Sequence, residues 1–253
     1  MINNETMYKM MYKRKSFHMF RGLGDHAITQ EELSEIEKMY KNLTPLFSDI
    51  KTEMRIVPAS ETNAARGAEY CLFLYSEPKD GYLRNIGYLG EQMDLLLTSM
   101  DIATLWFGLG KTEEKAYNGL DFVIMIAISK AESGKFRKSI DKTKRKDLEM
   151  GWFGDTIPGV SDIARFAPSA CNSQPWVVEH VDNRIMVFRT RKPGRNGIMP
   201  ADLVPFFNRI DMGIYLCFLE LCLTHENIEC VRTLHEDWGG DVTKIINAEY
   251  ITK

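Results

Sequence analysis

Two long apolar segments of helical periodicity constrain the fold of this 253-residue chain more than any other feature. Residues 85–105 and 205–226 each carry an apolar face, made of Leu95, Leu96, Leu97 and Ile102 in the first and of Ile210, Ile214, Leu216, Leu219 and Leu223 in the second. A glycine stands near the start of each segment, Gly87 in the first and Gly213 in the second. This similarity suggests that the chain consists of two related halves.

Shorter elements surround these helices in a similar order. Thr29-Gln30-Glu31-Glu32 forms a capping box that predicts a helix start, and an apolar face of Leu33, Ile36 and Tyr40 follows it. Residues 70–75 and 121–129 are typical of buried strands. The other predicted elements are a short helix at 160–166, a hairpin of strands 177–181 and 185–190 that turns at Asp182-Asn183, and strands at 228–234 and 245–251.

A polar, basic segment at residues 133–146 separates the two series of elements. We therefore predict two domains that meet near Met150, residues 1–150 and residues 151–253. The alternation of helices with buried strands is typical of an α+β or α/β protein.

Composition excludes several classes of protein. The 32 Lys and Arg against 35 Asp and Glu provide no basic field that would select nucleic acid. The five cysteines and the histidines lack the spacing of a disulfide framework or a metal site, and Cys217 and Cys222 fall in an apolar helix. No apolar run reaches the roughly 18–20 residues of a membrane span, and residues 1–15 lack the features of a signal peptide. We expect a cytoplasmic protein with no metal and no membrane partner.

A basic segment near the N-terminus combines an arginine, lysines, a hydroxyl and an imidazole in Lys13-Arg14-Lys15-Ser16-Phe17-His18-Met19-Phe20. Such groups can surround a phosphate dianion, because Arg binds two oxygens at once and Ser donates a short hydrogen bond. The alternative is a solvated basic surface, which is common for short runs of this kind.

A second polar segment lies between two prolines, directly before a predicted strand, in Ala167-Pro168-Ser169-Ala170-Cys171-Asn172-Ser173-Gln174-Pro175-Trp176. Its small, hydroxyl and amide side chains suit hydrogen bonding to a flat polar ligand. The alternative is a helix stop followed by a turn, in which Asn172 and Ser173 bond only to their own backbone.

The two polar segments resemble signature motifs of the nitroreductase family. Residues 14–20 are similar to its N-terminal Arg-x-Ser-x-(basic)-x-Phe signature, and residues 168–176 are similar to its Pro-Ser-x-x-Asn-x-Gln-Pro-Trp loop. Residues 90–110 resemble the family's long interface helix and the turn that meets the flavin. Residues 122–128 and 142–148 resemble its last core strand and basic tail. The resemblance implies the α+β, FMN-dependent fold of that family.

The order of these motifs differs from that of ordinary family members, in which the loop follows soon after the signature. Here residues 43–58 hold no such loop, and it comes after residue 166. In the family's homodimer, the signature and the loop reach one flavin from opposite subunits. The resemblance is therefore to fused members with two halves, an intramolecular pseudo-dimer with one composite FMN site that permits a monomer.

Carried over residue by residue, the resemblance predicts FMN ligands but no catalytic side chain. The phosphate, ribityl chain and pyrimidine side would contact Arg14, Lys15, Ser16 and His18. The ring would contact Pro168, Ser169 and Asn172 from the second half, and Trp106, Phe107 and Gly108 near its reactive N5. The phosphate site would be completed by Lys144 or Arg145. The family has a long basic side chain where this chain has His18, so the charge that stabilises a reduced flavin would be weaker or pH-dependent.

The resemblance implies that NAD(P)H reduces the flavin, leaves, and is replaced over the same ring face by a small oxidant such as a nitroaromatic or a quinone. Two alternatives stay open. One is a non-catalytic FMN-binding protein for storage or sensing. The other is an enzyme that uses reduced flavin for another reaction, such as dehalogenation or ring reduction.

Overall fold

The computed structural model describes residues 3–63, 66–190, 197–237 and 244–253. Contacts between residues divide the chain into two compact units. Unit 1 comprises Met1–Tyr82 and Leu89–Ile140, and unit 2 comprises Leu83–Tyr88 and Asp141–Lys253. The two units therefore meet after Ile140 and also at both ends of residues 83–88. The predicted domains 1–150 and 151–253 stay a prediction. That the units are the two halves of a pseudo-dimer stays a prediction.

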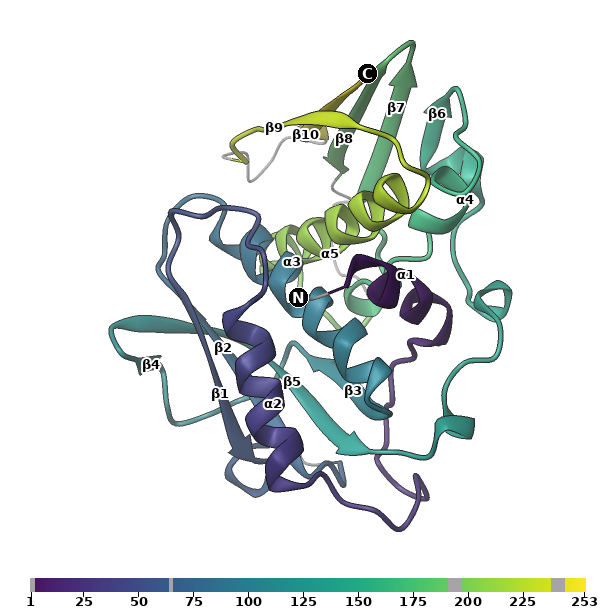
Figure 1. The fold of residues 1–253 in the computed structure, drawn as a ribbon. Helices are drawn as coiled ribbons and strands as arrows, with labels where there is room; N and C mark the ends of the chain where they lie inside the picture. Colours follow the sequence, from purple (N-terminus) through teal and green to yellow (C-terminus); the bar gives the residue numbers. More distant parts are fainter. Residues whose placement is uncertain (1–2, 64–65, 191–196, 238–243) are drawn as a thin grey trace. The chain divides into compact units, whose positions relative to one another are not determined.

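Unit 1 is built on an antiparallel sheet with the strand order β1-β2-β5-β3 (Figure 1). Its strands are β1 (Thr52–Pro58), β2 (Tyr70–Ser76), β3 (Ile102–Phe107), β4 (Ala116–Tyr117) and β5 (Leu120–Lys130). Its helices are α1 (Asn4–Lys13), α2 (Gln30–Lys41) and most of α3 (Tyr82–Ser99), with 3-10 turns η1 (Ala59–Glu61), η2 (Ser133–Lys135) and, at its end, η3 (Ile140–Lys142). The predicted strands at 70–75 and 121–129 are confirmed as β2 and β5, whereas α1 and β1 were not predicted.

The central strands β2 and β5 provide much of the core of unit 1. Phe73 on β2 and Met125 on β5 are buried in one apolar cluster with Phe17 and Phe20 of the N-terminal segment. Burial of apolar surface contributes roughly 25 cal/mol per Å² to folding. The cluster therefore fixes the residues that follow Arg14 against the sheet.

Helix α2 begins with the predicted capping box. The Glu32 backbone N–H donates to Thr29 Oγ1 at 3.2 Å, and the Thr29 backbone N–H donates to Glu32 Oε2 at 3.0 Å. The two groups satisfy each other's free donors at the helix start. The helix packs against β1 with Ile36 and Tyr40 buried, so this prediction is confirmed (Figure 1).

The predicted helix at 85–105 is wrong at its C-terminal end. Helix α3 ends at Ser99, and β3 begins at Ile102 and pairs antiparallel with β5. Between them Asp101 adopts a left-handed φ of 54°, which an α-helix cannot continue. Ile102 is buried as predicted, but it is buried from a strand. A short apolar run fits either element, and pairing with β5 decides between them.

Unit 2 contains a second sheet with the strand order β6-β7-β8-β10-β9, in which β6 and β7 run parallel and the other neighbours are antiparallel (Figure 1). The strands are β6 (Trp152–Gly154), β7 (Trp176–Val181), β8 (Arg184–Thr190), β9 (Cys230–Leu234) and β10 (Lys244–Thr252). The helical elements are η4 (Leu148–Met150), α4 (Ser161–Ala164), η5 (Ala170–Asn172) and α5 (Val204–His225). The predicted hairpin, the short helix, the long helix and the two last strands are confirmed, and β6 was not predicted.

Helix α5 is buried along almost its whole length. It packs against β8, α4 and η5 (Figure 1). Cys217 and Cys222 lie in its interior, as predicted for core residues. A helix that is apolar around most of its circumference is stable only inside a protein, so α5 is the core element of unit 2.

The two glycines near the helix starts are points of backbone contact within unit 2. A Cβ added at Gly87 would lie 2.0 Å from the carbonyl oxygen of Ile210. A Cβ added at Gly213 would lie 1.9 Å from the carbonyl oxygen of Arg84. The first turns of α3 therefore touch α5 backbone to backbone, which no residue with a side chain permits without a shift of one helix.

We expect Gly213→Ala to destabilise the protein by about 1–3 kcal/mol, because the added methyl group forces the two helices apart. Helix propensity by itself would favour Ala by up to about 1 kcal/mol. A loss of stability in urea denaturation therefore measures the clash. Gly151→Ala is the control, since nothing lies within 4 Å of its added Cβ. Stability equal to the wild type in Gly213→Ala would contradict this packing.

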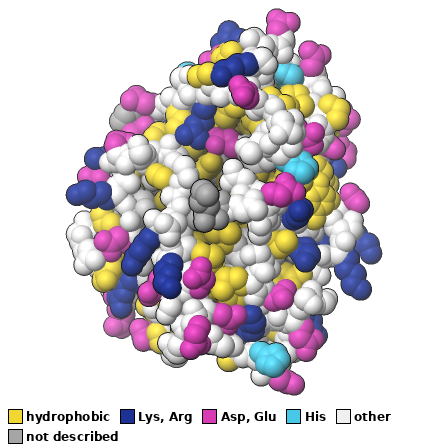
Figure 2. Space-filling model, in the orientation of Figure 1, with side chains coloured by type: hydrophobic (Ala, Val, Ile, Leu, Met, Phe, Trp, Pro, Cys, Tyr) yellow, Lys and Arg dark blue, Asp and Glu magenta, His cyan; other side chains and the backbone are white. Residues whose placement is uncertain are grey.

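The surface of the described residues carries charges of both signs. On the face drawn in Figure 2, Lys and Arg side chains are interspersed with Asp and Glu side chains. None of the helices within residues 3–63, 66–190, 197–237 and 244–253 is long and apolar enough to cross a membrane.

Candidate functional site

The N-terminal signature is joined to β3 through the buried carboxylate of Asp94 on α3. Arg14 Nε donates to Asp94 Oδ2 at 2.8 Å, and Trp106 Nε1 donates to the same oxygen at 3.0 Å. Thr104 Oγ1 donates to Asp94 Oδ1 at 2.5 Å, and a backbone bridge pairs Thr104 with Ser16. The structure thus brings together Arg14, Ser16 and Trp106, which were predicted to contact one ligand.

Arg14 itself is engaged inside the protein. Its side chain is only 3% exposed, and Glu91 lies 3.6 Å from its Nε in addition to Asp94. Burial disfavours the charge, but the two carboxylates outweigh it and raise the pKa of Arg14 above its usual value. Its Nη2 also donates to Ser16 Oγ at 3.2 Å. The geometry gives Arg14 a bracing role, and its predicted contact with a phosphate stays a prediction.

The next residues of the signature lie at the surface of unit 1. Lys15 is exposed, donates to the carbonyl oxygen of Lys135 at 3.2 Å, and places its Nζ 4.7 Å from the centre of the Phe17 ring. His18 is exposed as well. These side chains can reach a ligand without breaking a buried interaction.

Arg66 joins this cluster, although it was not predicted. Its Nη1 lies 3.4 Å from the carbonyl oxygen of His18, and its guanidinium lies 4.9 Å from the centre of the Phe107 ring. Its own carbonyl oxygen accepts the N–H of Phe20 at 3.1 Å. Gly108, the residue after Phe107, is exposed. A lone arginine before Gly67 carries no local pattern, so only the fold reveals that it meets the signature.

The second motif forms a compact loop in unit 2, residues 168–174. Three of its non-glycine residues have a left-handed φ: Cys171 at 49°, Asn172 at 54° and Gln174 at 47°. Ser169 Oγ accepts the N–H of Gln174 at 2.9 Å. Pro168 is buried, Ser169 is half-buried, and Asn172 is exposed. The segment does form a turn, as the alternative predicts. However, the side chains of Asn172 and Ser173 form hydrogen bonds with residues outside the loop.

The basic tail meets this loop directly. Asn172 Nδ2 donates to the carbonyl oxygen of Lys144 at 3.2 Å, and Arg145 Nη1 donates to Asn172 Oδ1 at 3.0 Å. Arg145 also donates to the carbonyl oxygens of Phe166 and Ala167. Lys144 is exposed. The structure therefore unites Lys144, Arg145, Ser169 and Asn172, and it uses Arg145 largely to hold the loop.

Asp211 on α5 binds the loop from the interior. Its Oδ1 accepts the N–H of Ala170 at 2.8 Å, and its Oδ2 accepts the hydroxyl of Ser173 at 3.0 Å. Burial raises the pKa of Asp211 from its usual 3.8 to about 8, and these two hydrogen bonds offset only part of that rise. Asp211 was not predicted to take part in this site.

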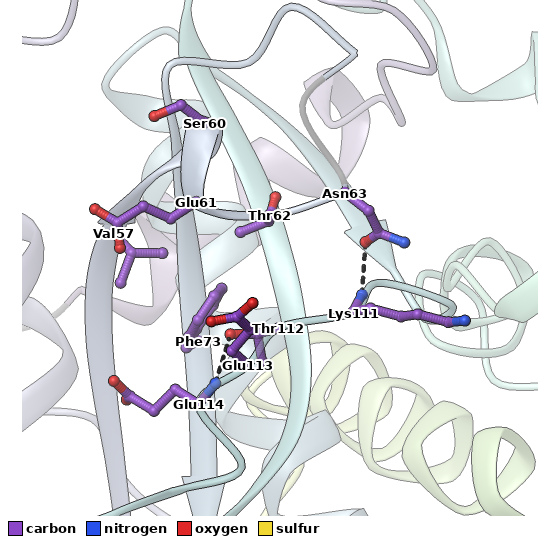
Figure 3. A pocket seen from close by; sticks show the side chains of 10 residues that line it. All are labelled: Val57, Ser60, Glu61, Thr62, Asn63, Phe73, Lys111, Thr112, Glu113 and Glu114. Atoms are coloured by element: carbon purple, nitrogen blue, oxygen red, sulfur yellow. Dashed lines mark hydrogen bonds between the residues drawn. The ribbon is translucent and has the colours of Figure 1, made fainter.

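A cleft of about 630 Å³ opens in unit 1 where η1 faces the turn after β3 (Figure 3). Phe73 and Val57 line it with several polar side chains, among them Glu61, Glu113 and Glu114. The Lys111 backbone N–H donates to Asn63 Oδ1 at 2.6 Å across it. Its carboxylates repel an anion, so this cleft does not suit a phosphate.

A second cavity of unit 1, about 550 Å³ in volume, has the opposite character. It is lined by Lys9, Tyr12, Lys13, Ser133, Gly134, Phe136, Arg137 and Lys138. Burial and the nearby charge of Arg14 lower the pKa of Arg137 to about 10. Neither of these cavities is lined by a predicted FMN ligand. Within the described ranges no group of three or more His, Cys, Asp or Glu residues could hold a metal ion.

The chain belongs to a nitroreductase family. A family model described as "Putative TM nitroreductase" matches residues 6–223. No curated protein matches the chain. The α+β, nitroreductase-like fold predicted from the motifs is thereby confirmed, and its composite pseudo-dimer arrangement stays a prediction.

One of the solved structures that the chain resembles supports the fold. A "putative nitroreductase" from Thermotoga maritima has a TM-score of 0.60 at 17% identity, over 97% of this chain and 92% of that one. A nitroreductase family protein from Clostridium difficile has a TM-score of 0.44 at 11% identity, over 60% and 98% of the two chains. A "putative nitroreductase" from Desulfovibrio desulfuricans, solved in complex with FMN, has a TM-score of 0.41 at 15% identity over 60% and 98%.

We expect Arg14→Ala to lower the free energy of unfolding by about 3–5 kcal/mol, since it leaves the buried Asp94 without its charged partner. Thermal and urea denaturation measure the loss. Lys15→Ala is the matched control, because it removes the neighbouring cation from the surface and should cost less than about 1 kcal/mol. Similar losses in the two variants would contradict the bracing role of Arg14.

The raised pKa of Asp211 predicts a pH dependence of stability. A carboxyl group that binds its proton more tightly in the folded chain stabilises the fold at low pH and loses that contribution as pH rises toward the folded pKa. The wild type should therefore lose stability from about pH 4 to pH 8 relative to Asp211→Asn, which cannot ionise. Thermal unfolding at several pH values tests this. A difference in Tm that is independent of pH would refute it.

Proposed function

We propose that the protein is an FMN-dependent oxidoreductase that transfers electrons from NAD(P)H to a small oxidant such as a nitroaromatic or a quinone. The observation that supports this most is the clustering of both family motifs with the side chains predicted to act beside them. The signature lies with Trp106 and Phe107 in unit 1. The 168–174 loop lies with Lys144 and Arg145 in unit 2.

The exposed groups of the first cluster fit a ligand with an anionic phosphate and a flat ring. Lys15 and Arg66 supply cations, and Phe107 supplies a half-buried aromatic face. Asp94 holds the Trp106 indole in place beside them. The family that the motifs resemble has a long basic side chain at the position of His18. Arg66 lies next to His18 and offers a permanent charge there. Arg14 fits less well as a phosphate ligand, because its guanidinium is bound to Asp94.

The exposed groups of the second cluster fit the same ligand. The Asn172 amide is oriented by Lys144 and Arg145, and it lies at the surface. Lys144 is exposed and adds a positive charge to that surface. Amide and hydroxyl groups of this kind can bond to the polar edge of an isoalloxazine ring. Both clusters therefore take part in FMN binding in this proposal.

Bound FMN would supply the two-electron chemistry that no side chain of the protein can perform. The protein's own residues bind the cofactor, orient its ring and adjust the charge around it. The proposal needs no general acid or base from the protein. A monomer would suffice if both clusters of one chain serve one cofactor.

The decisive experiment is the visible spectrum of the purified protein after incubation with FMN and gel filtration. We expect a retained flavin spectrum that bleaches when NADH or NADPH is added without oxygen and returns with an added quinone. A colourless protein would refute FMN binding. A yellow protein that neither nucleotide bleaches would favour a storage or sensing role instead.

We expect Asn172→Ala and Lys15→Ala each to raise the Kd for FMN by about tenfold, because each removes a hydrogen-bonding or charged group worth about 1.5 kcal/mol. Quenching of flavin fluorescence measures the Kd. Asn183→Ala and Lys79→Ala are matched controls, since they remove an exposed amide and an exposed cation outside both motifs. Asn183 lies in the turn between β7 and β8, at the end of β7 away from the loop. An unchanged Kd in either test variant would remove that residue from the proposed site.

A further inference from the structure

The 168–174 loop depends on a buried carboxylate that is not among the predicted FMN ligands. Asp211 is 2% exposed on α5, and both of its carboxylate oxygens accept hydrogen bonds from the loop. The donors are the N–H of Ala170 and the hydroxyl of Ser173. They flank Cys171 and Asn172, the two exposed residues at the tip.

The conformation of the loop explains why it needs such an anchor. Cys171, Asn172 and Gln174 all adopt the left-handed region, which is unfavourable for residues other than glycine. Such a conformation persists only where surrounding structure holds it. The basic tail holds the loop from one side through Asn172 and Gln174. Asp211 holds it from the helix through the residues on either side of the tip.

We propose that Asp211 is a positioning residue for FMN binding, which keeps the 168–174 loop in the conformation that presents the Asn172 amide to the cofactor. This inference rests on the proposed function. Because the carboxylate is buried, Asp211 acts through Ala170 and Ser173. Its effect is therefore on affinity for FMN rather than on any step of the reaction.

A carboxylate with a purely structural role would affect only the stability of unit 2. Asp237 provides the comparison, because it is also buried and both of its carboxylate oxygens accept hydrogen bonds. Arg189 donates through Nε at 2.7 Å and Nη2 at 2.6 Å, and Asn247 Nδ2 donates at 3.4 Å. Neither Arg189 nor Asn247 belongs to the loop. Asp237→Asn therefore serves as the matched control for Asp211→Ala.

The thiol of Cys171 in the loop can report on the loop's conformation. Cys171 is exposed, Cys71, Cys217 and Cys222 are buried, and Cys230 is half-buried. In a Cys230→Ser background, the fast reaction of the folded protein with dithiobis(nitrobenzoic acid) therefore reports on Cys171. This reaction rate measures the state of the loop in protein without FMN, and it is independent of any enzymatic activity.

The experiment compares Asp211→Ala, Asp211→Asn, Ser173→Ala and Asp237→Asn by the Kd for FMN and by the Cys171 reaction rate. Asp211→Ala should raise the Kd about tenfold or more and should change the rate several-fold. Asp211→Asn should stay within about threefold of the wild type, because an amide can bond to both loop groups. Ser173→Ala should fall between them, and Asp237→Asn should leave the folded protein's Kd and rate unchanged.

Wild-type values of both quantities in Asp211→Ala would overturn the inference. Equal losses in Asp211→Ala and Asp237→Asn would also overturn it, since they would indicate a general loss of stability. If Asp211→Ala does not fold, Ser173→Ala and Asp211→Asn decide, and wild-type values of the Kd and of the Cys171 reaction rate in Ser173→Ala would overturn the inference. Failure of the wild type to bind FMN would refute the proposed function instead, and the thiol rates would still show whether Asp211 holds the loop.

Discussion

The backbones of α3 and α5 touch at Gly87 and Gly213, and the arrangement of unit 2 depends on this contact. A methyl group at either position would overlap a carbonyl oxygen of the other helix. Nearly all of α5 is buried, and the helix contacts η5, which lies in the 168–174 loop. Asp211 lies two positions before Gly213, so the same helix that makes the backbone contact also carries the anchor of the 168–174 loop.

Two arginines that the resemblance predicts as phosphate ligands also brace the protein. Arg14 is bound to Asp94, and Arg145 donates to backbone oxygens beside the 168–174 loop. An arginine has five donors in a rigid fork, so it can hold several acceptors at once. The exposed lysines at 15 and 144 stay available for an anion. The motifs therefore combine side chains that are engaged inside the protein with side chains that lie at its surface.

Much of the fold was predictable where the pattern was long or the local chemistry specific. The capping box at Thr29, the hairpin at Asp182 and the buried α5 follow from local rules. The end of α3 was not predictable, because the apolar run continues through β3 and only pairing with β5 makes it a strand. Arg66 and Asp211 were missed as members of the clusters for a similar reason. Each acts on a segment far away in the chain, so no local pattern identifies it.

The sequence by itself determined the family, the α+β composition and the identity of the two polar motifs, because these are properties of residue order and periodicity. Tertiary structure alone decided which of those side chains are engaged and which are exposed. Arg14 and Lys15 are neighbours in sequence, yet one is bound to a buried carboxylate and the other lies at the surface. The physical reason is that burial and hydrogen-bond partners are supplied by distant segments, α3 for Arg14 and α5 for the 168–174 loop.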